Sequence, residues 1–254
     1  MKKVILHLFK YFGYSISKRG FQKDLYKDIK DSEFWNIYAK CKPFTMTSVE
    51  RLYSLYCSVD YVLKYNINGA FVECGVWRGG SSMLIAIMLE QRKIFDRMIY
   101  LYDTFEGMPE PSKVDISIEG DKAEILLYKT KRINNDNSIW CFADLMDVTR
   151  NMKSTNYPER NIVYVKGKVE DTVPAKLPTD EIAILRLDTD WYESTKHELN
   201  ILYPILVKNG VLIIDDYGHW QGCKLAVDEY FSQNNIPILF NRIDYTCRQA
   251  IKSE

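Results

Sequence analysis

Four aspartates follow two apolar segments of the sequence. Asp188 and Asp190 come after EIAILRL, and Asp215 and Asp216 come at the end of GVLII. Runs that are almost continuously apolar are typical of strands buried on both faces of a parallel sheet. If the two strands are neighbours, four carboxylates converge on one edge, where repulsion and burial are costly without a cation. Carboxylate oxygens suit Mg²⁺, so the pattern predicts a divalent cation site, with solvated turn aspartates as the alternative.

A glycine-containing turn follows an earlier apolar run, in FVECGVWRGGSS. Glu73, Gly75, Val76 and Gly79 lie in it, and a helix is expected to begin near Ser81. Glycines at such a strand-to-helix turn let a ligand approach the backbone. The pattern E-x-G-x-x-x-G-G differs from the dinucleotide motif G-x-G-x-x-G, and an ordinary tight turn is the alternative.

Asp103 ends the next apolar run, MIYLYD. Nucleotide-binding α/β proteins keep an acid at this position for ribose hydroxyls. It lies 28 residues after Gly75, later than the usual spacing of about 20. A turn aspartate is an equal alternative.

Short apolar runs alternate with amphipathic stretches from about residue 69 onward. Strands are expected at 70–74, 98–103, 161–167, 181–188 and 210–215. Helices are expected at 81–93, 142–152, 194–206 and 222–234. This alternation predicts an α/β fold with a Rossmann-like, doubly wound, mostly parallel sheet.

Two segments fall outside that alternation. Residues 1–66 are expected to form a helical extension, with a helix over 47–65, before an α/β domain at 67–254. Residues 104–140 form a long polar connection with two prolines. Because such long loops in compact domains often cover binding sites, we expect this segment to act as a lid.

The charge distribution bears on partners and location. Lys and Arg total 34, as do Asp and Glu, and a neutral chain argues against a nucleic-acid partner. Residues 1–30 nevertheless carry eight basic and two acidic residues. A helix over 3–16 would be amphipathic, so residues 1–20 could contact a membrane surface peripherally or dock as an arm on the protein. Six scattered cysteines indicate reduced thiols and a cytoplasmic protein, which would lie at the inner membrane face if the arm binds lipid.

The stretches described above resemble the macrocin O-methyltransferase family of class I S-adenosylmethionine-dependent enzymes. Its known members methylate sugar hydroxyls, including those on macrolide and aminocoumarin antibiotics. The similar stretches lie within about residues 69–231 and are FVECGVWRGGSS, LYDTFEGMP, KGKVEDTVP and the segment from LRLDTDWYEST through IIDDYGHWQGC to AVDEYF. The resemblance implies a class I methyltransferase fold, S-adenosylmethionine as methyl donor and a Mg²⁺ site.

The resemblance also implies roles for individual residues. Asp188, Asp215 and Asp216 match the family's metal ligands, and Asp190 matches its general base. Thr189 stands where the family commonly has Gly. The expected donor-binding set is Glu73, Gly75, Val76, Gly79, Ser81 and Asp103.

The expected function is O-methylation of a sugar hydroxyl in a glycoside, surface polysaccharide or antibiotic precursor, by a chain that forms a homo-oligomer. A catechol-type enzyme acting on a phenol, a nicotinamide-dependent oxidoreductase and a non-catalytic donor-binding module are the alternatives. His219 is a candidate substrate contact or alternative base, with a polar residue at the rim as the alternative. Tyr192, Tyr217 and Trp220 are candidates for the acceptor pocket, with core packing as the alternative.

Overall fold

The computed structural model describes residues 25–133, 141–175 and 181–254. The chain divides into two compact units, Met1–Asn36 and Ile37–Glu254. The expected helix over 3–16 and the membrane contact through residues 1–20 lie outside the described residues and stay predictions. Among the residues described, no helix has the length and hydropathy needed to cross a membrane.

The described part of the first unit leads into α3 (Ser32–Cys41). The Asp31 carboxylate accepts the amide hydrogens of Glu33 and Phe34, which closes the first turn of the helix. The Trp35 indole donates to the Ile29 carbonyl at 2.9 Å.

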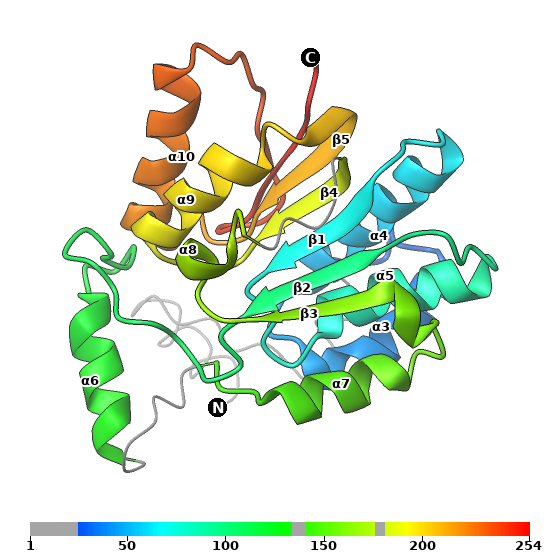
Figure 1. Ribbon diagram of the computed structural model, residues 1–254, viewed down its shortest axis with the longest axis horizontal. Coiled ribbons are helices and arrows are strands. Elements are labelled where there is room, and N and C mark those ends of the chain that lie inside the picture. Colours follow the sequence, from blue (N-terminus) through cyan, green and yellow to red (C-terminus); the bar gives the residue numbers. More distant parts are fainter. Residues whose placement is uncertain (1–24, 134–140, 176–180) are drawn as a thin grey trace, which may run out of the picture. The chain divides into compact units, whose positions relative to one another are not determined.

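In the described part of the second unit, seven strands form one sheet in the order β3-β2-β1-β4-β5-β7-β6 (Figure 1). The strands are β1 (Ala70–Cys74), β2 (Ile99–Asp103), β3 (Ile162–Lys166), β4 (Ile182–Leu187), β5 (Leu206–Ile214), β6 (Asn241–Arg242) and β7 (Arg248–Ile251). The pairs among β1 to β5 are parallel, whereas β7 is antiparallel to both β5 and β6. The expected mostly parallel sheet is confirmed.

Helices cover both faces of this sheet (Figure 1). One layer contains α4 (Val49–Lys64), α5 (Gly80–Gln91) and α7 (Leu145–Lys153). The other contains α8 (Val169–Thr172), α9 (Tyr192–Leu202) and α10 (Gln221–Gln233). The fold is therefore the expected doubly wound α/β architecture.

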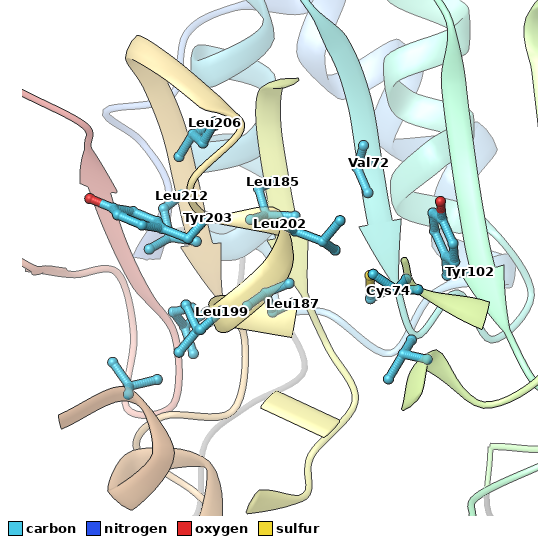
Figure 2. Packing of buried hydrophobic residues seen from close by; sticks show 14 of the residues in the cluster. Val72, Cys74, Tyr102, Leu185, Leu187, Leu199, Leu202, Tyr203, Leu206 and Leu212 are labelled. Carbon is cyan, nitrogen blue, oxygen red and sulfur yellow. The ribbon is translucent and has the colours of Figure 1, made fainter. Parts of the chain in front are cut away.

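Successive side chains of β4 point to opposite faces of the sheet, so core residues lie on one face and site residues on the other. Leu185 and Leu187 pack in the hydrophobic cluster beneath Leu199 and Leu202 of α9 (Figure 2). Arg186, between the two leucines, points to the opposite face, because successive side chains of a strand alternate. The same alternation applies along β1, so the sheet presents polar side chains to the α4–α5 layer near its carboxyl edge.

The strand order reverses direction between β1 and β4, and the chain is tightly packed at that point. The Asp188 amide donates to the Cys74 carbonyl at 2.8 Å. A Cβ atom on Gly75 would lie 1.9 Å from the Asp188 carbonyl oxygen, and Gly75 has a φ of +81°. Only glycine fits there. Ligands of open α/β sheets bind at this kind of switch point.

The connection after β2 is more structured than the sequence indicated. It contains α6 (Ala123–Ile133), and its earlier part is attached to the α9 layer. The Trp191 indole donates to the Pro109 carbonyl at 3.1 Å, and the Tyr192 amide donates to Asp115, which is 1% exposed. Residues 134–140 lie outside the described part, and movement of the segment as a lid stays a prediction.

Several element boundaries differ from those expected. The helix expected over 194–206 ends at Leu202, since Pro204 cannot supply a helical amide hydrogen and restricts the residue before it. The helix expected to begin near Ser81 begins at Gly80, with Gly79 as its N-cap. The structural units divide after residue 36, and α4 packs against α5 and β4 in the second unit. The expected division at residues 66 and 67 stays a prediction.

Candidate active site

A cavity of about 570 Å³ opens where the carboxyl ends of β1, β2, β4 and β5 meet. Its volume is within the usual range for small-molecule sites. Of the donor-binding set expected from the sequence, five residues line it: Glu73, Gly75, Val76, Ser81 and Asp103. Asp188, Asp190, Asp215 and Asp216 line it as well. Gly79 is not among the lining residues and instead caps α5 with a φ of +87°.

Glu73 is a buried carboxyl on the central strand, 2% exposed. Arg186 Nη1 donates to its Oε1 at 2.6 Å, and the Ser82 hydroxyl from α5 donates to its Oε2. Burial raises the pKa of Glu73 to about 7, although the Arg186 charge and the Ser82 hydrogen bond oppose the shift. Both oxygens therefore have protein donors.

Asp103 organises the glycine turn from the end of the neighbouring strand. Its Oδ2 accepts the amide hydrogens of Val76 at 2.7 Å and Trp77 at 3.1 Å. Its Oδ1 accepts the Phe105 amide at 2.7 Å. Burial raises the pKa of Asp103, and these hydrogen bonds oppose that shift. Asp103 therefore ends β2 and its carboxylate holds the backbone of the turn, while its contact with a ribose stays a prediction.

Asp188, Asp215 and Asp216 form a close group at the ends of β4 and β5. One carboxylate oxygen from each lies within 4.8 Å of the other two. Burial raises the pKa of Asp188 and of Asp215 to about 6, in both cases against the charge of Arg186. Burial and the neighbouring charge of Asp190 raise the pKa of Asp216 well above its ordinary value. The group carries more negative charge than its surroundings compensate.

Two arginines offset part of that charge. Arg186, whose side chain is 4% exposed, donates to Asp188 at 2.6 Å and to Asp215 at 2.7 Å. Arg51 of α4 pairs with Asp215 and, through Nε, with Asp244 at 3.1 Å. Asp216 has no such partner, and its buried Oδ2 lacks a hydrogen-bond partner among the described residues.

Asp190 lies beside this group in a backbone conformation that is rare for residues other than glycine. Its φ is +67°, and strained residues of this kind cluster at functional sites. The Asp216 carboxyl and the Trp220 indole lie within hydrogen-bonding reach of its side chain. Burial raises the pKa of Asp190 to about 7. The left-handed turn therefore directs this carboxyl to the cavity next to the three grouped aspartates.

The donor set of the group fits a hard divalent cation. All three candidate ligands are carboxylates, and the group contains no Cys or His. The bare Asp216 oxygen is an acceptor that a cation would satisfy. Gly75 lines the same cavity beside Glu73 and Asp103.

Of the four residues considered as acceptor contacts, two line the cavity and two do not. Trp220 and His219 line the cavity. Tyr192 and Tyr217 are not among the lining residues, and their hydroxyls donate at 2.7 Å to Glu229 and Asp228 of α10.

The site also contains residues that the sequence did not single out. Arg186 had a local signal, since it is a lone charge in an apolar strand, two residues before Asp188 and on the same face. Arg51 and the 44–47 segment also line the cavity, but they come from far earlier in the chain and no local pattern marked them. Ser82 was visible only as the residue after the expected helix start.

A doubly wound sheet with a glycine turn after its first strand, an acid ending the second, and grouped acids ending β4 and β5 defines a class I O-methyltransferase. The chain belongs to the macrocin O-methyltransferase (TylF) family, whose sequence profile matches residues 14–250. It is therefore an S-adenosylmethionine-type methyltransferase, and the oxidoreductase and the non-catalytic module considered above are set aside.

Named relatives and a solved structure agree with this assignment. Demethyldecarbamoylnovobiocin O-methyltransferase of Streptomyces niveus is 33% identical over 192 residues, 76% of this chain and 69% of the relative. A tetracenomycin-rhamnoside 4'-O-methyltransferase of Streptomyces olivaceus is 33% identical over 202 residues, 80% of this chain and 73% of the relative. The structure of the O-methyltransferase NovP matches with a TM-score of 0.70 and 31% identity, covering 83% of each chain.

Proposed function

We propose that this enzyme transfers the methyl group of S-adenosylmethionine to a sugar hydroxyl, with Mg²⁺ held by Asp188, Asp215 and Asp216. The observation that carries the proposal is the group of three carboxylates within 4.8 Å, in which Asp216 retains a bare buried oxygen. The sugar acceptor is supported by the relatives, two of which are named for methylating a rhamnosyl tetracenomycin and a demethylated novobiocin precursor.

The two ends of the cavity take separate parts of the reaction. The Gly75 turn and the acids Glu73 and Asp103 would hold the donor, which supplies an electrophilic methyl group on a sulfonium. A bound Mg²⁺ would supply a Lewis acid that lowers the pKa of an acceptor hydroxyl. This matters because a carboxylate is a weak base toward a free alcohol.

Asp190 is the proposed general base. Its carboxyl faces the cavity beside the three ligands, so it can take the hydroxyl proton while the oxygen bonds to the methyl carbon. The carbon–sulfur bond breaks, and its electron pair remains on the sulfur of the departing thioether. Trp220, which lies within hydrogen-bonding reach of Asp190, would keep the carboxyl in this orientation.

The attached segment 104–122 is proposed to exclude water from the reaction. Thr104, Gly107, Met108 and Pro109 line the cavity, and the bond from Trp191 to Pro109 ties them to the loop that carries Asp190. Excluding water strengthens the electrostatic interactions inside a site.

Product analysis tests the proposed function. The full-length protein is incubated with S-adenosylmethionine, Mg²⁺ and a panel of rhamnosides, nucleotide sugars and catechols, and the products are identified by mass spectrometry. We expect methylated sugars that disappear with EDTA and return when Mg²⁺ is added in excess. Methylation of catechols alone would refute the sugar acceptor, and sugar methylation that survives EDTA would refute the metal.

A further inference from the structure

His219 has a ring nitrogen that the protein leaves without a partner. The residue lies on the turn between β5 and α10 and lines the cavity described above. Its Nδ1 is buried and has no hydrogen-bond partner among the described residues. His197 differs, because its Nε2 lies 2.8 Å from the Val173 carbonyl oxygen. Buried polar atoms in proteins are normally paired, so a bare one on a residue that lines a cavity points to a ligand.

The turn that carries His219 is held firmly. The His219 amide donates to the Asp216 carbonyl at 3.0 Å, and the Gly218 amide donates to the Thr246 carbonyl at 2.7 Å. A Cβ on Gly218 would lie 1.9 Å from the Tyr245 carbonyl oxygen. The backbone has little freedom to shift, which suits a side chain that must position a substrate.

Neighbouring rings fix the imidazole itself. Trp220 meets it edge-on with centroids 4.8 Å apart, and Tyr245 does so at 6.1 Å. The same Trp220 lies within hydrogen-bonding reach of Asp190. His219 is therefore one aromatic ring away from the proposed base, and it lies outside the group of three carboxylates proposed to bind the metal.

We propose that His219 determines acceptor specificity by hydrogen-bonding a second sugar hydroxyl, adjacent to the one that is methylated. This inference rests on the proposed function. A hydroxyl both donates and accepts, so it pairs with Nδ1 in either imidazole tautomer. The aromatic walls formed by Trp220 and Tyr245 suit the apolar face of a pyranose ring. The acceptor class is thus a sugar with a free hydroxyl next to the reacting one.

The test compares acceptors that differ by one hydroxyl. The first probe is p-nitrophenyl α-L-rhamnopyranoside, together with its singly deoxygenated analogues and any better sugar from the product panel. In the wild type, deleting the neighbouring hydroxyl should lower kcat/KM about 10- to 100-fold, because the buried nitrogen is left unpaired. In His219→Phe both acceptors should react at the same low rate, with the affinity for S-adenosylhomocysteine unchanged.

Two further variants separate recognition from folding. An Asn amide places a polar atom near the position of Nδ1, so His219→Asn should recover part of the discrimination, whereas His197→Ala should keep all of it. If His219→Phe discriminates between the two acceptors as well as the wild type does, the inference is wrong while the proposed function stands. If the wild type methylates no sugar at all, both are wrong.

Discussion

The two halves of the cavity treat their carboxyl groups differently. At the ends of β1 and β2, Glu73 and Asp103 have hydrogen-bond donors on both oxygens. At the ends of β4 and β5, Asp216 keeps a buried oxygen that has no partner in the described structure. We call the end of the cavity at β1 and β2 the donor half, and the end at β4 and β5, where we propose that Mg²⁺ binds, the metal half. The protein itself pairs the carboxyl oxygens of the donor half, whereas one carboxyl oxygen of the metal half has no partner in the described structure.

This difference separates a preformed binding surface from one that needs its ligand. A paired carboxyl in a low-dielectric site holds its position without help, as the Asp103 carboxylate does for the backbone of the glycine turn. Grouped carboxyls repel one another where neighbouring arginines balance only part of their charge, and binding a cation relieves that repulsion. We therefore expect substitution or ion removal in the metal half to lower activity strongly. Substitution in the donor half should mainly lower the free energy of unfolding.

The largest expected effect is loss of turnover in Asp190→Asn. An amide cannot accept the hydroxyl proton, so kcat should fall about 100- to 10,000-fold. S-adenosylhomocysteine affinity, measured by calorimetry, should stay within about twofold of wild type, because the donor half is intact. Asp228→Asn, at an exposed pair with Lys224, is the control. Near-normal turnover in Asp190→Asn would remove this residue from the base role.

Arg186→Leu should destabilise the folded protein itself. Arg186 pairs with Glu73, Asp188 and Asp215, and removing one partner of a buried ion pair costs about 3–5 kcal/mol. Chemical denaturation of the metal-free protein measures this loss. The control is Lys153→Met at the exposed pair with Glu159, which should change stability by less than about 1 kcal/mol. Equal stability of the two variants would contradict the role assigned to Arg186.

The strands that frame both halves could be predicted closely, because a buried parallel strand has a strong local signature. β1 occupies the expected residues, β2 begins one residue later than expected, and β3 and β4 are one residue shorter at each end, whereas β5 begins four residues earlier and ends one residue earlier. β6 and β7 were missed because they are short and partly exposed, with sequences NR and RQAI. Their pairing with β5 depends on tertiary contacts rather than on local pattern. α6 was missed because its segment was interpreted as a polar connection.

The site residues also divide into those that a local sequence pattern marks and those that only tertiary contacts bring to the site. The four aspartates could be found because each ends a predicted strand or follows one within three residues. Arg51 could not, since it reaches Asp215 from a helix 164 residues away in the chain. The bare Nδ1 of His219 is visible only in the folded protein, where residues from far apart in the chain surround the ring, and no local pattern encodes it.

Adding Mg²⁺ to metal-free protein should raise Tm. A ligand that binds only the folded state at ten times its Kd adds about 1.4 kcal/mol, and each kcal/mol is worth about 2–4 °C for a chain of this size. EDTA should reverse the shift. Asp216→Asn should lose it because the variant lacks a ligand, whereas Asp228→Asn should keep it. A shift that survives in Asp216→Asn would place the ion elsewhere.

The last prediction concerns Glu198, a third kind of carboxyl that neither half uses. It is fully buried, and Thr189 Oγ1 donates to its two oxygens at 3.0 and 3.1 Å. Burial raises the pKa of Glu198 well above its ordinary value, against the opposing Thr189 hydrogen bond. Glu198 therefore has a higher pKa in the folded protein than in the unfolded chain. At a pH between these two values, the folded protein keeps the Glu198 proton and the unfolded chain has lost it. Wild-type stability should fall as pH rises from the unfolded pKa toward the folded one.

Glu198→Gln removes this titration and keeps the shape of the side chain. Its free energy of unfolding relative to wild type should therefore rise as the pH increases from 5 to 8, because only the wild type loses stability through this titration. The control is Glu193→Gln, which changes an exposed glutamate on the same helix. Its free energy of unfolding plotted against pH should run parallel to that of the wild type across this range. If Glu198→Gln also runs parallel, Glu198 is ionised in the folded protein.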